Sequence, residues 1–190
     1  MFTSTSNTSL AETGTDMLIP LIRAAATIGF AIAPCSLGFV IIAVSEQLIR
    51  SILVGDDPEM LMSDLQNQYP NEVIELNETD DDGLVAKVVE LIERPGQASK
   101  LPLDIRGTDF QMRVWDELQK VPAGTTVSYT FLAEQIGAPN AVQTVEHACA
   151  TNPLAVAIPC HRAVRANGDL AGYRWGIDRK RALLEREVMK

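Results

Sequence analysis

The first half of the chain combines strand-length apolar runs with two amphipathic segments. Residues 25–33 and 38–54 are largely apolar, and the second run is interrupted near Ser45. We predict that they form strands of an antiparallel sheet, because short apolar runs bounded by turn residues are typical of buried strands. Helices are predicted at residues 56–69, where Asp residues precede the apolar positions, and at residues 84–93.

One stretch in this half has the length of a membrane span. Residues 24–44 contain no charged side chain over 21 positions, and about 20 apolar residues are enough to cross a bilayer. Pro34 and Gly38 interrupt the stretch, however, and the apolar runs on either side of them are only as long as strands. We therefore predict two buried strands joined by a turn, and no membrane association.

The second half opens with an amphipathic helix. Phe110, Val114, Trp115 and Leu118 fall on one face when the segment "TDFQMRVWDELQKV" is wound as a helix. Thr108 stands before the first apolar position as a candidate N-cap. This spacing predicts a helix that buries one face against a core.

Two shorter segments then have the pattern of a helix-turn-helix. The first follows Ser128, a candidate N-cap, and stops at Gly137, whereas the second begins near Pro139 and ends at Asn152. Ser before a helix, Pro at its start and Gly after its end are preferred at those positions. Two short helices joined by a tight turn that contains Gly predict a DNA-binding arrangement.

Three further elements complete the pattern. Residues 154–160, "LAVAIPC", predict a strand because they form a short apolar run. The Asn167-Gly168 pair predicts a hairpin wing within "RANGDLAGYRWG". Residues 178–190 predict a closing helix.

Charge divides the chain into two parts. Residues 1–100 hold 5 Lys or Arg and 15 Asp or Glu, whereas residues 101–190 hold 11 and 10. An acidic half joined to a near-neutral half indicates two modules, with "RPGQASKLPLD" as the linker. We predict a disordered segment at residues 1–17, an α/β domain at residues 18–97 and a second domain at residues 98–190.

The composition argues against several kinds of site. Three cysteines and two histidines in 190 residues are too few for a disulfide framework and lack the spacing of a zinc site. The acidic segment at residues 77–83, "NETDDDG", lacks the alternating ligands of a calcium loop and predicts a solvated linker. No secretory signal is predicted, so we expect a reduced, cytoplasmic setting with no metal and no cofactor.

One cysteine and one histidine stand side by side in "AIPCHRAV", residues 157–164. The pair is compatible with a buried small residue beside a structural histidine. Composition favours that structural interpretation, but the pair is also compatible with a thiolate that His161 generates from Cys160, provided that a third group orients the imidazole. Glu185 and Glu187 in the last predicted helix are candidates for that group, and spacing alone does not choose between them.

Four motifs carry a family resemblance. The segments "IPCHRAVR", "TVSY", "ATNPLAVAIPCHR" and "GYRWGIDRKRALLERE" together resemble the O6-alkylguanine-DNA alkyltransferases, most of all the carboxy-terminal domain of bacterial Ada-type members. The resemblance is dense from about residue 101 to residue 188 and extends through "RSILVGDD" toward residue 30. It implies an α+β fold, with a ribonuclease H-like N-terminal sheet and helices and a C-terminal winged helix-turn-helix domain.

The resemblance also implies an activity and a partner. Family members transfer an alkyl group from guanine O6, and in some substrates from thymine O4, irreversibly to one of their own cysteines. The implied enzyme is a methylated-DNA–protein-cysteine methyltransferase that acts once. Its partner would be double-stranded DNA that contains O6-alkylguanine, and the protein would be a monomer. The target base lies inside a stacked duplex, so it must be flipped out before reaction.

Family roles carry over to matching positions of this chain. Cys160 would accept the alkyl group after activation through water by His161, which Glu187 would orient. Asn152 would brace the turn between the helices and the cysteine, and Tyr129 would protonate guanine N3. The implied guanine pocket is lined by Tyr173, the backbone near Arg174, Trp175, which narrows it, Val164 and Pro159. The implied DNA contacts are Gln143, Thr144, Ser128 and Arg165.

The chain departs from the family pattern on the helix that enters DNA. The family's intercalating arginine is replaced by Gln143, and very small residues are replaced by Glu146 and His147. No Lys or Arg occurs from residue 121 to residue 161. Because phosphate neutralisation supplies most non-specific affinity, we expect weak binding to duplex DNA.

Two alternative functions follow from this departure. The first is a paralogue with impaired DNA binding, or a self-labelling variant, that accepts alkyl groups from free base or nucleoside derivatives. The second is a winged-helix module that senses damage without repairing it. Sensors of this family lack the acceptor cysteine, so the presence of Cys160 disfavours the second alternative.

Overall fold

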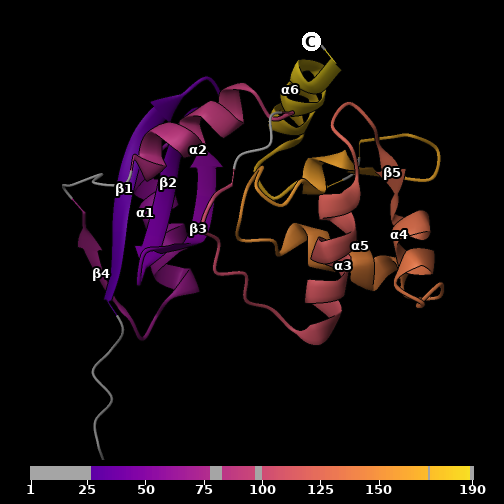
Figure 1. The fold of residues 1–190 in the computed structure, drawn as a ribbon, viewed down its shortest axis with the longest axis horizontal. Helices are drawn as coiled ribbons and strands as arrows, with labels where there is room; N and C mark the ends of the chain where they lie inside the picture. Colours follow the sequence, from indigo (N-terminus) through magenta and orange to yellow (C-terminus); the bar gives the residue numbers. More distant parts are fainter. Residues whose placement is uncertain (1–26, 78–82, 97–99, 171, 189–190) are drawn as a thin grey trace, which may run out of the picture.

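The structure is a computed structural model that describes residues 27–77, 83–96, 100–170 and 172–188. Figure 1 shows two units side by side, one built on a sheet and one built mainly of helices. The sheet unit consists of β1 (Thr27–Cys35), β2 (Gly38–Ser45), β3 (Leu48–Gly55), α1 (Pro58–Gln68), β4 (Val73–Leu76) and α2 (Leu84–Glu93). The helical unit consists of α3 (Asp109–Lys120), β5 (Val127–Ser128), α4 (Tyr129–Gln135), α5 (Val142–Ala150), the 3₁₀ turn η1 (Cys160–Arg162), β6 (Ala163–Val164) and α6 (Ile177–Val188). The segment predicted to be disordered, residues 1–17, lies outside the described residues, as does most of the acidic segment.

The first unit is organised by a mixed four-stranded sheet in the order β3-β2-β1-β4, so the fold is α+β. β1, β2 and β3 are antiparallel neighbours, which confirms the strands predicted from the apolar runs. Glu46 and Gln47 both have positive φ, and this backbone suits a two-residue hairpin turn. β4 pairs with β1 in parallel; its four residues are too short for the apolar pattern to predict.

Both faces of the sheet are covered, which explains why β2 and β3 are apolar at most positions. Ile41 and Leu53 pack with α1, whereas the alternate residues Ile42 and Ile52 pack with α2 and the helical unit. Successive side chains on a strand point to opposite faces, so a strand covered on both sides lacks a polar face. Within the described residues, no helix is long and apolar enough to cross a membrane.

The helical unit is built around α3. Thr108 caps α3, as predicted, and Val114, Trp115 and Leu118 are buried on one face of it. Trp115 Nε1 donates a hydrogen bond to the carbonyl oxygen of Ala148 at 2.9 Å. The indole therefore fixes α5 against α3.

α4 and α5 form the predicted pair of short helices, with one correction. Ser128 caps α4, and Gly137 follows it with φ of 72°, a backbone that glycine adopts at little cost. The prediction that the second helix begins near Pro139 is wrong. A turn occupies residues 139–140 first, and α5 begins at Val142 with Ala141 as its N-cap.

The strand predicted at residues 154–160 is wrong. The stretch consists mostly of turns, and Leu154 alone of its residues bridges to another strand. The stretch is buried because it lies along the free edge of β3. Ile52 N donates to the carbonyl oxygen of Pro153 at 2.9 Å, and Ala155 N donates to that of Ile52 at 3.0 Å. The apolar pattern of residues 154–160 therefore reflects their burial and does not indicate that they pair with a neighbouring strand along their whole length.

The connection between the units uses the same edge of β3. Ile49 N donates to the carbonyl oxygen of Pro102 at 2.7 Å, and Asp104 N donates to that of Ile49 at 2.9 Å. One core cluster also runs through both units and includes Ile52 and Leu118. The units are thus packed into a continuous core.

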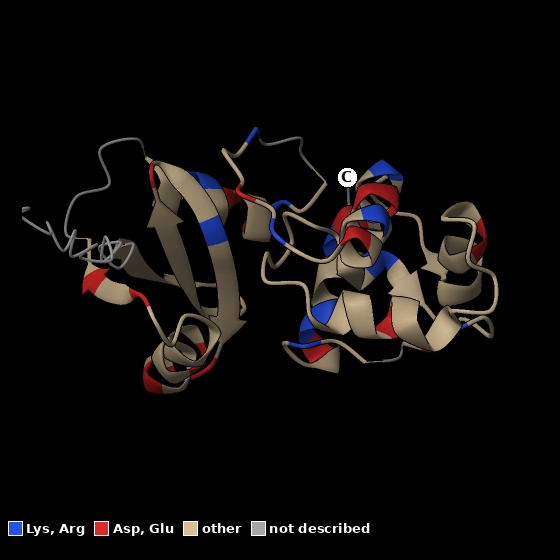
Figure 2. Cartoon of the chain, turned by 90° about the horizontal axis from the view of Figure 1, so that it is seen from below, with Lys and Arg blue, Asp and Glu red and all other residues tan. Residues whose placement is uncertain are grey.

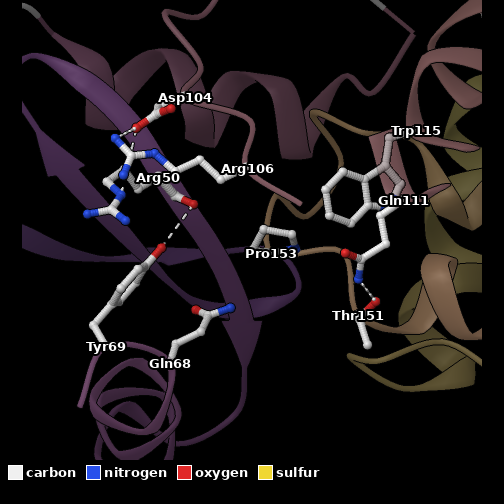
Figure 3. A pocket seen from close by; sticks show the side chains of 9 residues that line it. All are labelled: Arg50, Gln68, Tyr69, Asp104, Arg106, Gln111, Trp115, Thr151 and Pro153. Carbon is white, nitrogen blue, oxygen red and sulfur yellow. Dashed lines mark hydrogen bonds and ion pairs between the residues drawn. The ribbon is translucent and has the colours of Figure 1, made fainter. Parts of the chain in front are cut away.

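A cleft of about 210 Å³ lies beside this junction. Figure 3 shows that residues of both units line it, with Arg50 and Tyr69 on one side and Gln111 and Thr151 on the other. The Arg50 guanidinium lies 4.8 Å from the centre of the Tyr69 ring and pairs with Glu72 at 2.8 Å. Gln111 Nε2 donates to Thr151 Oγ1 at 2.9 Å. Arg50, Tyr69 and Glu72 belong to the sheet unit, whereas Gln111 and Thr151 belong to the helical unit, so these contacts fix the two walls of the cleft.

The turn predicted at Asn167-Gly168 is present, and Arg165 N donates to the carbonyl oxygen of Asp169 at 3.0 Å. β6 pairs in parallel with β5, however, and within the described residues no second strand follows the turn. The predicted hairpin is therefore wrong. The predicted closing helix is confirmed as α6.

We expect Gly38→Ala to destabilise the sheet unit. Gly38 has φ of 107°, and a Cβ there would clash with the carbonyl oxygen of Gly55. Strain and clash together should lower the free energy of unfolding by about 2–4 kcal/mol. Gly168→Ala is the control, because Gly168 has φ of 85° but open space around it, so the loss should be about 1 kcal/mol. Urea unfolding measures both, and equal losses would contradict the role of the Gly55 contact.

Candidate active site

A single side-chain amide organises the segment that carries the cysteine, residues 152–160, which we name the cysteine loop. Asn152 is 0% exposed. Its Nδ2 lies 3.2 Å from the Leu154 carbonyl oxygen, 3.0 Å from the Ile158 carbonyl oxygen and 3.2 Å from Cys160 Sγ. Its Oδ1 accepts a hydrogen bond from Leu154 N at 2.8 Å. The amide thus supplies the bonds that neighbouring strands would otherwise provide.

The cysteine loop changes direction sharply before it reaches Cys160. Val156 has φ of 65°, a conformation that is rare for a β-branched residue and costs about 1–3 kcal/mol. Pro159 then directs the chain into η1, which contains both Cys160 and His161. The two side chains leave one tight turn instead of opposite faces of a strand, so they can serve one site.

The thiol of Cys160 is held in its protonated form at rest. The residue is 3% exposed. Burial raises the pKa of the thiol to about 11, although the hydrogen bond from Asn152 and the charge of Lys180 oppose the rise. Since the thiolate is the nucleophile, reaction near neutral pH requires a base that removes this proton.

His161 has the protonation state that such a base needs. Its Nε2 lies 2.8 Å from Glu187 Oε1, and an ionised carboxylate only accepts, so Nε2 carries the proton. Burial lowers the pKa of His161, although Glu187 opposes this effect, so the ring is neutral. Nδ1 therefore keeps its lone pair. It is buried and has no hydrogen-bond partner among the described residues.

Glu187 is bonded from three directions. Besides His161, Arg162 Nη2 donates to Oε1 at 2.7 Å, and Gly124 N donates to Oε2 at 3.0 Å. Burial alone would raise the pKa of Glu187, but these hydrogen bonds hold it at about 2. Of the two glutamates considered from the sequence, Glu187 is buried against His161, whereas Glu185 is exposed.

The sequence reasoning missed two buried cations. Lys180 is 0% exposed, its Nζ donates to the carbonyl oxygen of Ala163 at 2.6 Å, and it lies 5.9 Å from the centre of the Tyr129 ring. Arg162 is buried beside Glu187. Both stand inside recognisable motifs, "PCHR" and "DRKR". A basic residue in a sequence usually indicates the surface, because Lys and Arg are rarely buried without a partner.

Aromatic side chains lie around the turn at residues 173–176, which precedes α6 and which we name the aromatic turn. The rings of Tyr173 and Trp175 meet edge to face, with centres 5.1 Å apart and planes at 72°. Arg174 Nη1 donates to the carbonyl oxygen of Asn152 at 3.4 Å, which links this turn to the cysteine loop. Burial raises the pKa of Tyr129 and that of Tyr173, so both hydroxyls keep their protons at neutral pH.

The remaining residues predicted from the sequence to bind guanine or DNA lie on β5, on β6, after β6 and on α5. Val164 in β6 pairs with Ser128 in β5, and Ser128 Oγ accepts from Phe131 N at 3.0 Å to cap α4. Gln143 and Thr144 are exposed on α5, and Arg165 is exposed after β6. The structure therefore places the three last-named residues on the surface.

The outer face of α5 is acidic or neutral. Glu146 is half-buried, and its Oε1 would lie 3.9 Å from a Cβ at Gly172, next to the aromatic turn. Since no Lys or Arg occurs from residue 121 to residue 161, the ribbon of α4 and α5 carries no blue in Figure 2. This surface has little to attract phosphates.

The arrangement is suited to covalent chemistry at a thiol. Nucleophiles are activated by a base that a third group orients. Here the nucleophile would be the buried cysteine, the base the neutral imidazole with its free lone pair, and the orienting group the ionised carboxylate bound to the other nitrogen. Within the described residues, no group of three or more His, Cys, Asp or Glu side chains lies together as a metal site would require.

Comparisons with known proteins identify the family. Residues 109–189 match the family described as "6-O-methylguanine DNA methyltransferase, DNA binding domain". The crystal structure of Mycobacterium tuberculosis OGT in complex with DNA is similar, with a TM-score of 0.67 and 33% identity over 85% of this chain and 92% of that chain. The chain therefore belongs to the O6-methylguanine-DNA methyltransferase family, the alkyltransferases that its motifs resemble.

Curated relatives have corresponding names. The Escherichia coli (strain K12) "Bifunctional transcriptional activator/DNA repair enzyme Ada" is 46% identical over 159 residues, which is 84% of this chain and 45% of Ada. The "Methylated-DNA--protein-cysteine methyltransferase" of Mycobacterium tuberculosis (strain ATCC 25618 / H37Rv) is 56% identical over 85 residues, 45% of this chain and 52% of that protein. The chain thus spans about half the length of these curated relatives.

We expect Glu187→Gln to destabilise the protein most at neutral pH. The folded-state pKa of Glu187 lies below its usual value, at about 2. The stabilisation by its charge is therefore present above pH 4.5 and is lost as the pH falls toward 2. A shift of this size corresponds to about 3 kcal/mol.

Urea unfolding at a series of pH values measures this effect. The difference in unfolding free energy between the wild type and Glu187→Gln should shrink steadily between pH 5 and pH 2. Glu185→Gln is the control, because Glu185 is exposed on the same helix, and it should change stability little at any pH. A difference that does not depend on pH would contradict the ionic role of Glu187.

Proposed function

We propose that the chain is a DNA repair alkyltransferase that moves an alkyl group from guanine O6 irreversibly onto Cys160. The observation that carries the proposal is the buried thiol in one 3₁₀ turn with His161, whose far nitrogen is bound by Glu187. Membership of the family supports it, as do the names of the relatives, which include DNA repair and cysteine methyl transfer.

The reaction that this geometry supports is one displacement at carbon. His161 Nδ1 takes the thiol proton through a bridging water, and Glu187 holds the imidazolium that forms. The sulfur of Cys160 then bonds to the alkyl carbon as the bond from that carbon to O6 breaks. The electron pair of the broken bond stays on guanine, and Tyr129, which holds its proton at neutral pH because it is buried, protonates N3. The proton on His161 then returns to the tyrosinate through water, so both side chains regain their resting states. The S-alkylcysteine is stable, so each chain reacts once.

The remaining residues receive their roles from the family resemblance. Asn152 holds Sγ in place through its amide. The pocket for the flipped guanine is lined by Tyr173, the backbone near Arg174, Val164 and Pro159, and narrowed by Trp175. Duplex DNA lies against Ser128, Gln143, Thr144 and Arg165.

The resemblance also supplies a finer description of the protein. Residues 18–97 form a ribonuclease H-like domain, and residues 98–190 form a winged-helix domain. The protein is a cytoplasmic monomer, consistent with three cysteines that are all free thiols. Thymine O4 is a second position from which it takes alkyl groups.

One observation favours a second candidate function, that of an acceptor for alkylated free base or nucleoside with DNA binding impaired. Glu146 places a carboxylate beside the aromatic turn, and α5 presents Gln143 where family members carry an arginine. Arg binds phosphates through a planar set of donors that Gln lacks. The chemistry at Cys160 is the same in both functions, and they differ only in the carrier of the alkylated guanine.

We expect Cys160 to be the single alkyl acceptor. After incubation with O6-methylguanine DNA, peptide mapping by mass spectrometry should find one added methyl group per chain on Cys160 and no turnover. Cys160→Ser should remain unmodified, whereas Cys35→Ser and Cys149→Ser should react like the wild type. Label on Cys35 or Cys149, or more than one product per chain, would contradict the proposal.

We also expect weak binding to an unmodified duplex with a shallow salt dependence. The double variant Gln143→Arg with Glu146→Ala should tighten binding by about 2 kcal/mol, because it adds one attraction and removes one repulsion. Fluorescence anisotropy with a short duplex at two salt concentrations measures both quantities. Glu134→Ala on α4 is the control for loss of one negative charge elsewhere. Tight, steeply salt-dependent binding by the wild type would show that Arg165 or other basic residues carry the contact.

A further inference from the structure

One arginine of α6 connects the aromatic turn to the sheet unit. Arg179 Nη1 donates to the carbonyl oxygen of Trp175 at 2.8 Å. Its Nε donates to the carbonyl oxygen of Leu37 at 2.9 Å, and its Nη2 donates to Asp56 Oδ1 at 2.5 Å. Leu37 precedes β2 and Asp56 follows β3. A planar guanidinium thus binds three acceptors from both units at once.

The sheet unit presents its two acceptors in a fixed arrangement. The turn between β1 and β2 lies so close to the end of β3 that a Cβ at Gly38 would clash with the Gly55 carbonyl oxygen. This close approach brings Leu37 and Asp56 within reach of one guanidinium. The position of Arg179 is therefore set by the sheet unit.

The helical unit presents the aromatic turn at residues 173–176, which Arg174 connects to the carbonyl oxygen of Asn152. Gly176 N donates to the carbonyl oxygen of Tyr173 at 3.0 Å, and Gly176 has φ of 97°. Trp175 lies within this turn and is 7% exposed. Its ring packs against the ring of Tyr173, so a shift of the turn would move both aromatic walls together.

We propose that Arg179 is a positioning residue through which the sheet unit sets the width of the alkyl pocket. It acts on Trp175 and not on the reacting atoms. This inference rests on the proposed function, which assigns Tyr173 and Trp175 to the guanine pocket. Without the guanidinium the turn loses this connection to the sheet unit and moves outward at Trp175, while Arg174 still connects it to Asn152, and the site accepts larger alkyl groups.

The test compares two alkyl donors in matched variants. Arg179→Lys keeps the charge but loses the planar set of donors. We expect it to raise the ratio of the rate with O6-benzylguanine to the rate with O6-methylguanine by at least fivefold. Arg181→Lys is the control on the same helix, because Arg181 is exposed and pairs with Asp178 at 2.8 Å. Its ratio should stay within twofold of the wild type.

Asp56→Asn separates the contribution of the sheet unit. It leaves the bonds from Arg179 to Leu37 and Trp175 possible and removes only the charge, so the ratio should rise less than in Arg179→Lys. The pKa of Cys160, read from the pH dependence of its reaction with iodoacetamide, should be unchanged in Arg179→Lys and in Asp56→Asn, because neither residue contacts the thiol. A ratio within twofold of the wild type in folded Arg179→Lys, or an equal rise in Arg181→Lys, would overturn the inference.

A second measurement is independent of alkyl transfer. The chain has two tryptophans, and Trp115 is 1% exposed in the core. Acrylamide quenching of tryptophan fluorescence should therefore increase in Arg179→Lys through Trp175, and not in Arg181→Lys. If the wild type transfers no alkyl group from either donor, the proposed function fails while quenching still tests the position of Trp175. Unchanged quenching in Arg179→Lys would show that Arg179 does not hold the turn.

Discussion

A carboxylate buried away from water must be fully hydrogen-bonded, and this requirement at Glu187 determines much of the architecture of the protein. Its oxygens are bound by the imidazole of His161, the guanidinium of Arg162 and the backbone N–H of Gly124. His161 and Arg162 belong to η1, Gly124 lies in the turn before β5, and Glu187 itself lies on α6, so three segments distant in the sequence must meet at one point. The proposed activation of the thiol and the stability of the fold therefore depend on the same charge, and the same carboxylate fixes the tautomer of His161.

The reactive cysteine depends on the sheet unit as much as on its own half of the chain. Side chains of the helical unit donate repeatedly to backbone carbonyls across the boundary: Arg162 to Pro95 at 3.2 Å, Arg179 to Leu37 at 2.9 Å and Arg186 to Ile92 at 3.0 Å. Arginine suits this task because one planar group satisfies several acceptors. The N-terminal half therefore supports the site in two places. The edge of β3 binds the cysteine loop, and Leu37 and Asp56 bind Arg179, which holds the aromatic turn.

The sequence predicted those elements whose pattern is local. The bounds of α2, the cap of α3 at Thr108 and the three antiparallel strands follow from short-range periodicity and turn chemistry. The cysteine loop was misread as a strand because its shape is imposed by one amide, that of Asn152, and by an edge in the other unit. The buried cations were not predicted for a related reason. Nothing near Lys180 in the sequence indicates that the carbonyl oxygen of Ala163 accepts a hydrogen bond from its ammonium group. The motifs single out Cys160 as the proposed acceptor, but motifs do not specify which groups form hydrogen bonds with a buried charge.

The pairing of β3 with the cysteine loop has a consequence for biosynthesis. Ile52 in β3 pairs with Leu154, which is synthesised about 100 residues later. A ribosome adds roughly 5–20 residues per second. For several seconds or more the nascent sheet therefore presents an uncovered apolar edge, the kind of surface through which unfinished chains associate. Covering that edge requires that the cysteine loop has been synthesised, and the same contact gives the cysteine its surroundings. In a chain that has not finished folding, the thiol of Cys160 therefore also lacks the contacts that surround it in the folded protein.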